Sequence, residues 1–391
     1  MEQMAESKTI RMARMSRELK AKGHDIISLS LGEPDFNIPE PIKAAAHQAI
    51  TDNYSHYPPV GGFNELREAI CDKLNRDNQL HYAPHQVVVS TGAKQSLANL
   101  FLSLLDEGDE MLTSAPYWVS YPEMTRLSGA RFQAIETSIE QDFKLSPEQL
   151  AAKLNERTRI FLLCSPSNPT GAVYSHDELA GLVDVLSAHP QVLVISDEIY
   201  EYIQFEGRPA SIAQLPGMQE RTIIVNGLSK SFAMTGWRLG YIAAPQWIAQ
   251  ACEKLQGQFT SGANAIAQRA AIAALEGGNA LATPMLRAFE ARRNLMVDGL
   301  ASIDGVTLNQ PQGAFYLFPR VSSFFGRRTT EGATISDAEE LCMYLLRTAG
   351  VSTVPGDAFG APDYIRLSYA TSEEQLEQAI ERIGKALRQL K

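Results

Sequence analysis

Residues 222–238 read TIIVNGLSKSFAMTGWR. The first part, Thr222–Asn226, is rich in β-branched residues, which is typical of a strand buried inside a sheet. Small residues follow, with Lys230 among them and Arg238 further along the same segment. The segment therefore predicts a lysine and an arginine in a loop just beyond the end of a buried strand.

The position of Lys230 suits an amine that reacts with a carbonyl group. A model lysine has a pKa of about 10.4, and burial beside another cation lowers that value by several units. The neutral amine is the form that builds an imine with an aldehyde. Arg238 can hold a phosphate nearby. A solvated surface lysine is the ordinary alternative, and the segments described below decide against it.

The composition is that of a soluble globular protein. The chain has 391 residues, of which 45% are hydrophobic and 20% charged, and this length predicts two or three domains. The formal net charge of −10 argues against nucleic acids and anionic membranes as partners, because both bind basic surfaces.

The cysteines point to a reducing compartment. The four cysteines are Cys71, Cys164, Cys252 and Cys342. They lie far apart and match neither a zinc pattern nor a disulfide framework, so we expect reduced thiols, no metal site and a cytoplasmic protein. The apolar stretch Leu97–Leu105 is too short to cross a bilayer.

Strand-like runs alternate with helix-like stretches over most of the chain. The strand-like runs are Val87–Val89, Glu110–Leu112, Ile160–Leu163, Val192–Ile195, Thr222–Val225 and Gly240–Ala243. The stretches Lys94–Leu105 and Asp177–Ser187 have helical spacing. This alternation predicts an α/β fold with a parallel sheet covered on both faces by helices.

The two ends of the chain have a different pattern. Apolar residues at helical spacing predict a first helix that ends at Gly23. Long helices beyond about residue 265 are followed by the strand-like runs Gly313–Phe318 and Tyr364–Ser368. We expect a large domain over residues 45–286 and a smaller α+β domain formed by residues 1–44 and 287–391.

Polar residues follow the predicted strands of the large domain. Ligands in open α/β sheets bind beyond the carboxyl ends of the strands. Asp197 ends a hydrophobic strand, which is costly for a charge unless a cation such as a protonated pyridine nitrogen faces it. The helix start after Gly92 offers free N–H groups to a phosphate. Asn168 can donate to a phenolate oxygen, and Trp118 can stack on a flat ring.

Each of these residues also has an ordinary structural interpretation. Gly92 and Asn168 are common in turns, Asp197 can cap a helix, and Trp118 can belong to the core. Arg366, inside an apolar strand-like run, can bind a carboxylate through two parallel hydrogen bonds or simply face solvent. Their shared position beyond strand ends favours a single binding site.

The motifs follow one another in a familiar order. They are Ser30–Phe36, Tyr57–Gly62, Gly92–Gln95, Pro116–Met124, Asn168–Gly171, Ser196–Tyr200, Lys230–Arg238 and Arg366–Ala370. Together they resemble the pyridoxal-phosphate-dependent class I aminotransferases, and the bacterial-type aspartate aminotransferases most closely. The resemblance covers residues 28–370. It implies the fold of type I transferases, with a large domain of mostly parallel sheet flanked by helices and a smaller α+β domain.

The resemblance implies which residues hold pyridoxal 5′-phosphate. Lys230 would bind it covalently, and Asp197 would keep its pyridine nitrogen protonated. Asn168 and Tyr200 would hydrogen-bond the phenolic oxygen, and Trp118 would stack on the ring. The catalytic residues would be Lys230, Asp197 and Tyr200. The phosphate would lie against Ala93, Lys94, Ser229 and Arg238, together with Tyr57 of a neighbouring subunit.

The resemblance also implies a substrate site in a homodimer with shared active sites. Arg366 and the backbone of Gly32 would bind the α-carboxylate of the substrate, beside Trp118 and Asn168. Lys94 would bind the distal carboxylate, which Ser7 or Thr9 would cover. The chain departs from the family at Gly227, where serine is frequent and contacts the phosphate.

The predicted function is an aminotransferase that moves the amino group of aspartate or glutamate to a 2-oxo acid by a ping-pong mechanism. Its partners would be amino acids and 2-oxo acids, with no nucleic acid and no membrane. The alternatives are a broader or prephenate and aromatic specificity, or a carbon–sulfur lyase on the same fold that uses the same cofactor. A non-catalytic effector domain of a regulator is a further alternative.

Overall fold

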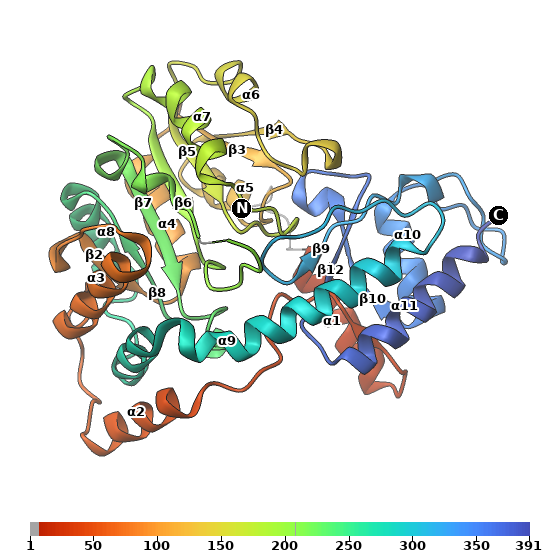
Figure 1. Cartoon of the computed structure of the whole chain (residues 1–391), viewed down its shortest axis with the longest axis horizontal. Coiled ribbons are helices and arrows are strands. Elements are labelled where there is room, and N and C mark those ends of the chain that lie inside the picture. Colours follow the sequence, from red (N-terminus) through yellow and green to blue (C-terminus); the bar gives the residue numbers. More distant parts are fainter. Residues whose placement is uncertain (1–7, 208) are drawn as a thin grey trace.

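The computed structural model describes residues 8–207 and 209–391 (Figure 1). Its main sheet has the strand order β2-β8-β7-β6-β5-β3-β4. The strands are β2 (Val87–Ser90), β3 (Glu110–Ala115), β4 (Arg131–Glu136), β5 (Thr158–Cys164), β6 (Leu193–Asp197), β7 (Thr222–Gly227) and β8 (Gly240–Ala243). Among these described strands, β8 runs in the opposite direction to the other six. The prediction of a mostly parallel sheet is therefore confirmed.

Helices cover both faces of this sheet. They are α2 (Glu40–Thr51), α3 (Asn64–Asn78), α4 (Ala93–Leu104), α5 (Tyr121–Leu127), α6 (Pro147–Ala151), α7 (His176–Ser187), α8 (Gln246–Phe259) and α9 (Ala265–Ala301). Ile223 and Val225 of β7 pack with α4 and α8, whereas Ile224 packs with α3 and α9 on the opposite face. Because both faces are buried, β7 shows a continuous apolar run rather than an alternating pattern.

The edge strand β4 was not predicted from the sequence. It pairs in parallel with β3, and most of its residues are partly or fully exposed. A strand covered so little needs no apolar run, and its sequence resembles a loop for that reason. Of the predicted strand Gly313–Phe318, only β9 (Tyr316–Leu317) forms a ladder.

The two ends of the chain pack together beside the main sheet, at the right of Figure 1. The elements here are α1 (Lys8–Ala21), β1 (Ile27–Ser28), β9, α10 (Ala338–Tyr344), β10 (Val351–Ser352), β11 (Val354–Pro355), β12 (Ile365–Ser368) and α11 (Glu373–Arg388). Strands β11, β12 and β9 form an antiparallel sheet, and β1 pairs in parallel with β10. Within the described residues, no helix has the length and hydropathy needed to span a membrane.

Helix α9 connects the two parts of the molecule (Figure 1). It is kinked at Gly278, whose φ of 47° and ψ of −136° are not helical. Residues before the kink, such as Leu275, pack in the core beside the main sheet, and Phe289 and Met296 pack in the core of the smaller part. The domain bounds at residues 44 and 286 remain a prediction; α2 and α9 run across them.

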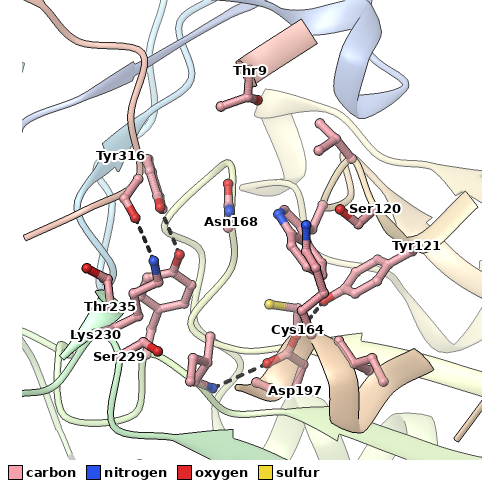
Figure 2. Close-up of a pocket in the computed structure, with 18 of the residues that line it drawn as sticks. Thr9, Ser120, Tyr121, Cys164, Asn168, Asp197, Ser229, Lys230, Thr235 and Tyr316 are labelled. Atoms are coloured by element: carbon pink, nitrogen blue, oxygen red, sulfur yellow. Dashed lines mark hydrogen bonds between the residues drawn. The ribbon is translucent and has the colours of Figure 1, made fainter. Parts of the chain in front are cut away.

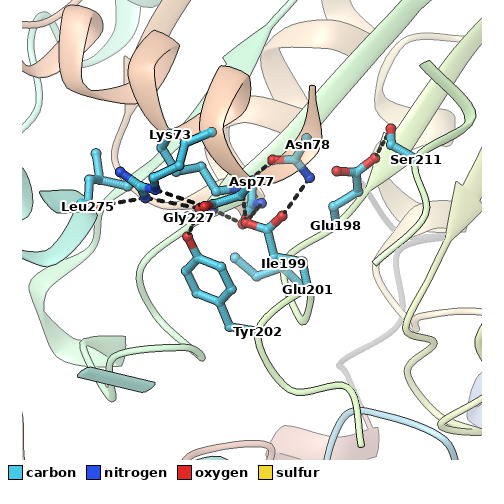
Figure 3. A network of polar contacts seen from close by, with 12 residues as sticks. Lys73, Asp77, Asn78, Glu198, Ile199, Glu201, Tyr202, Ser211, Gly227 and Leu275 are labelled. Atoms are coloured by element: carbon cyan, nitrogen blue, oxygen red, sulfur yellow. Dashed lines mark hydrogen bonds and ion pairs between the residues drawn. The ribbon is translucent and has the colours of Figure 1, made fainter. Parts of the chain in front are cut away.

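A buried polar network joins α3 to the main sheet (Figure 3). Glu201 is 5% exposed and pairs with the ammonium of Lys73, which is 1% exposed. The Nδ2 atoms of Asn78 and Asn226 donate to the two oxygens of Glu201 at 3.1 and 2.8 Å. The network ties α3 and β7 to the turn that follows β6.

The Lys73 ion pair predicts a large effect of single substitutions. Removing one partner of a buried pair costs about 3–5 kcal/mol, because the other charge stays buried. We expect Lys73→Met to lower the thermal unfolding midpoint strongly in calorimetry, and the double variant Lys73→Met with Glu201→Gln to recover part of the loss. Lys153→Met, at an exposed position, is the control. Equal midpoints for Lys73→Met and the control would contradict this account.

Candidate active site

The polar segments after the strands meet at one edge of the main sheet. β2, β3, β5, β6 and β7 run in the same direction, so their carboxyl ends share that edge. A cavity of about 260 Å³ lies there (Figure 2). The predicted residues that line it are Gly32, Ala93, Lys94, Trp118, Asn168, Asp197, Tyr200, Ser229, Lys230, Arg238 and Arg366.

Lys230 lies in the loop after β7, and its amine contacts the backbone of Gly32. The Nζ atom donates to the carbonyl oxygen of Gly32 at 2.5 Å. Burial lowers the pKa of Lys230 to about 8; the charge of Glu33 opposes this shift, and that of Arg366 adds to it. A substantial fraction of the amine is therefore a neutral nucleophile near physiological pH.

Asp197 ends β6 and is 5% exposed. The hydroxyl of Tyr121 donates to its Oδ2 at 2.7 Å, and the Ile199 amide donates to Oδ1 at 3.4 Å. Burial raises the pKa of Asp197 to about 6, although the Tyr121 hydrogen bond favours the carboxylate. A cationic group in the cavity would stabilise the ionised form of this carboxyl.

Arg366 and Asn168 meet across the junction of the two parts of the chain. Arg366 of β12 is 2% exposed; its Nη1 donates to Oδ1 of Asn168 at 2.9 Å, and its Nη2 donates to the carbonyl oxygen of Ser30 at 2.8 Å. Arg366 Nε is buried without a hydrogen-bond partner among the described residues. Because the Asn168 oxygen accepts from the arginine, its amide nitrogen is the end left to donate to a ligand.

The other end of the cavity is built for an anion. Helix α4 begins at Ala93, and its first N–H groups have no partner within the helix. Arg238 lies against this helix start, since a Cβ added to Gly92 would be 2.4 Å from its Nη2. The Nη1 of Arg238 donates to the Thr235 carbonyl oxygen at 2.9 Å, and Ser229 also lines this end.

Glycine residues make the close approach of backbone possible at this end. A Cβ at Gly240 would lie 2.2 Å from the amide nitrogen of Ala93. A Cβ at Gly227 would lie 2.9 Å from Cα of Gly240 and from the carbonyl oxygen of Leu239. A side chain at residue 227 would therefore be crowded by the close packing of β7 against β8.

Lys94 and Thr9 also line the cavity. The Lys94 ammonium is 4.9 Å from the centroid of the Trp118 ring, and burial, followed by the charge of Arg238, lowers its pKa. Thr9 of α1 also lines the cavity, and its hydroxyl has no partner among the described residues. Ser7, the alternative to Thr9, lies outside the residues that the structure describes.

Tyr57 is the predicted site residue that the described structure does not bring into the cavity. It is 97% exposed on the segment before α3.

The sequence interpretation assigned no role to two cavity residues that form hydrogen bonds. Tyr121 donates to Asp197, and Tyr316 shares a hydrogen bond with Tyr200. Tyr121 begins α5 three residues after Trp118, and the two rings lie 5.4 Å apart; this closeness in sequence to a predicted site residue is a signal that could have been used. Tyr316 lies inside an apolar run with no local sign of a site.

Comparison with known proteins identifies the family. The family model for class I and II aminotransferases matches residues 24–383. The chain belongs to the class I and II aminotransferase family. It is 49% identical over 386 residues to the "bifunctional aspartate aminotransferase and glutamate/aspartate-prephenate aminotransferase" of Petunia hybrida, a match that covers 97% of this chain and 80% of the relative.

Solved structures of aspartate aminotransferases are similar to this chain over nearly its full length. The aspartate aminotransferase of Rhizobium meliloti matches with a TM-score of 0.96 and 40% identity, covering 100% of this chain and 98% of that one. The aspartate aminotransferase of Thermus thermophilus with maleate matches with a TM-score of 0.92 and 39% identity, covering 98% and 97%. The predicted type I fold is therefore confirmed, as is the prediction of an aminotransferase.

The lowered pKa of Lys230 can be measured on the cofactor-free chain. We expect pulse acetylation of Lys230, followed by mass spectrometry of its peptide, to show half-maximal reactivity near pH 8, because burial disfavours the ammonium. In urea the same lysine should behave as a model lysine, with a midpoint near about 10.4. A midpoint near the model value in the folded chain would contradict the electrostatic description of the cavity.

Proposed function

We propose that this chain is a pyridoxal-phosphate-dependent aspartate aminotransferase that works by a ping-pong mechanism. The observation that carries the proposal is the gathering of a readily deprotonated lysine, a buried carboxyl and a buried arginine in one cavity. The cavity is lined by all three residues, Lys230, Asp197 and Arg366, although they come from strands or strand ends that are far apart in the sequence.

The residues present fit pyridoxal 5′-phosphate. Asp197 would face the protonated ring nitrogen, and the Asn168 amide and Tyr200 hydroxyl would donate to the phenolic oxygen. Trp118 offers a ring face for stacking. The phosphate would lie at the start of α4, against the backbone of Ala93 and Lys94 and the side chains of Ser229 and Arg238. When bound, the cofactor supplies an aldehyde and an aromatic ring that takes up the electron pair released at the substrate α-carbon.

The chain's own residues then perform binding and proton transfer. Arg366 binds the α-carboxylate of the amino acid with its guanidinium, beside the backbone of Gly32. Lys230, once its amine is free, takes the proton from the α-carbon as a general base and returns it as a general acid. Its pKa of about 8 suits both directions of transfer near neutral pH. Asp197 keeps the ring nitrogen protonated throughout.

The preference for a dicarboxylic substrate rests on Lys94, and Thr9 lines the same cavity. The relatives reported above are named for aspartate, and the Thermus structure was solved with maleate, a dicarboxylate. A cation at residue 94 would bind the distal carboxylate of aspartate. The Petunia name favours prephenate as a second acceptor, so prephenate belongs in the substrate panel. The carbon–sulfur lyase alternative is not favoured by these relatives.

Replacement of Lys94 tests the substrate assignment. A charge-assisted hydrogen bond contributes about 1.5–3 kcal/mol, so we expect Lys94→Met to lower kcat/KM for aspartate about tenfold to a hundredfold. Turnover of alanine, which has no distal carboxylate, should change little. Steady-state kinetics with both substrates, and Lys153→Met as the control, measure the ratio. An unchanged ratio of aspartate to alanine turnover would refute the role of Lys94.

We also propose a cytoplasmic homodimer with shared active sites. The exposed hydroxyl of Tyr57 supports this arrangement, because it is free to reach the phosphate site of a second copy. The four cysteines are unpaired, which supports a reducing compartment.

The dimer proposal predicts a dimer mass in light scattering and a specific effect of Tyr57. A hydrogen bond to a charged group contributes about 1.5 kcal/mol or more, so Tyr57→Phe should raise the dissociation constant of the cofactor about tenfold. Tyr54→Phe is the matched control, since the ring of Tyr54 packs edge-to-face against Phe63 of the same segment. An active monomer, or equal cofactor affinity in both variants, would rule out the shared site.

A further inference from the structure

Tyr316 contacts both Tyr200, which is proposed to bind the cofactor, and Arg366, which is proposed to bind the substrate. It lies on β9, directly opposite Ser368 of β12, and is 1% exposed. Its hydroxyl is 2.8 Å from that of Tyr200 (Figure 2). The guanidinium carbon of Arg366 lies 4.6 Å from the centroid of its ring. One side chain therefore contacts both the arginine proposed for the substrate and the tyrosine proposed for the cofactor.

The ring of Tyr316 supports Arg366 where hydrogen bonds do not reach. The two terminal nitrogens of Arg366 donate to Asn168 and Ser30. The rings of Tyr316 and Phe359 lie against the guanidinium, with their centroids 4.6 and 4.9 Å from its carbon. Cation–π contacts of this kind fix the plane of a guanidinium without using its N–H donors.

The hydroxyls of Tyr316 and Tyr200 share a hydrogen bond in which either oxygen can be the donor. Burial raises the pKa of Tyr200 well above its usual value and also raises that of Tyr316, so both phenols stay protonated. A single hydrogen bond joins them, and only one of the two hydrogens can occupy it. If Tyr316 donates, the Tyr200 hydrogen is free to point at a ligand.

The backbone around Gly32 keeps the Tyr316 hydroxyl in place. A Cβ at residue 32 would lie 2.2 Å from that oxygen, so the hydroxyl occupies the space that any larger residue would fill. The carbonyl oxygen of the same glycine accepts from Lys230. The Tyr316 hydroxyl is thus held between Gly32 and Tyr200.

We propose that Tyr316 is a positioning residue with two separable actions. Its hydroxyl donates to Tyr200 and so aims the Tyr200 hydrogen at the phenolic oxygen of the cofactor, and its ring holds Arg366 in the plane that binds the substrate carboxylate. This inference rests on the proposed function. Tyr316 acts through Tyr200 and Arg366, and neither action requires it to touch the reacting atoms.

The two actions are separated by two substitutions. Tyr316→Phe removes the hydroxyl and keeps the ring. A donor at the phenolic oxygen favours the unprotonated linkage between Lys230 and the cofactor, so its weakening should raise the pH midpoint of the visible absorbance by about 0.5–1 unit. KM for aspartate should stay within about twofold. Tyr316→Leu also removes the ring and should raise KM about fivefold to thirtyfold.

Two further variants show whether the effect passes through Tyr200. In a Tyr200→Phe background, adding Tyr316→Phe should produce no further shift of the absorbance midpoint, as a double-mutant cycle requires for residues that act in series. Tyr369→Phe is the matched control: this tyrosine is 0% exposed and its hydroxyl donates to the Ala314 carbonyl oxygen at 3.3 Å, outside the cavity lining. It should leave the midpoint unchanged.

The outcomes distinguish this inference from the proposed function. A wild-type midpoint in Tyr316→Phe, or an equal shift in the Tyr369→Phe control, overturns the action of the hydroxyl. An unchanged KM in Tyr316→Leu overturns the action of the ring. A wild-type chain that develops no visible absorbance with pyridoxal 5′-phosphate overturns the proposed function itself. Calorimetry of each variant identifies any that fail to fold, and the double-mutant cycle then decides from the remaining pairs.

Discussion

The buried amine of Lys230, bonded to a carbonyl oxygen rather than to a carboxylate, is the feature on which the chemistry depends. Gly32 accepts its hydrogen bond at 2.5 Å, and burial brings its pKa to about 8. A carboxylate in place of that carbonyl would hold the lysine as an ammonium. The buried carboxyl of Asp197, which lines the same cavity, is instead bonded to Tyr121. The fold thus places an amine and a carboxyl in one cavity with no ion pair between these two described residues.

The turn that carries Asp197 is anchored by buried hydrogen bonds to Glu198 and Glu201. Asp197 at the end of β6 faces the cavity, whereas Glu198 and Glu201 lie in the polar network beside α3 (Figures 2 and 3). Hydroxyls of Ser196 and Ser211 donate to Glu198 at 2.8 and 2.6 Å. Burial, followed by the charge of Glu201, raises the pKa of Glu198 to about 7. The same turn therefore carries cavity residues on one face and its own anchors on the other.

The sequence predicted the parts of the molecule whose signals are local. Buried strands are continuous apolar runs, and the polar residues directly after them share one edge, so Asn168, Asp197 and Lys230 could be grouped before the structure was known. Tyr316 could not, because its place is set by the pairing of β9 with β12, between segments far apart in the chain. Lys73 gave no signal of its buried ion pair for a similar reason: its partner Glu201 comes from a distant segment. The edge strand β4 lacked an apolar run because little covers it.

The most direct test is to find the residue that bonds to the cofactor. The chain should be loaded with pyridoxal 5′-phosphate, reduced with borohydride, digested and mapped by mass spectrometry. The account predicts one reduced adduct, on the side-chain nitrogen of Lys230. An adduct on another lysine, or none in a chain that catalyses transamination, would contradict it.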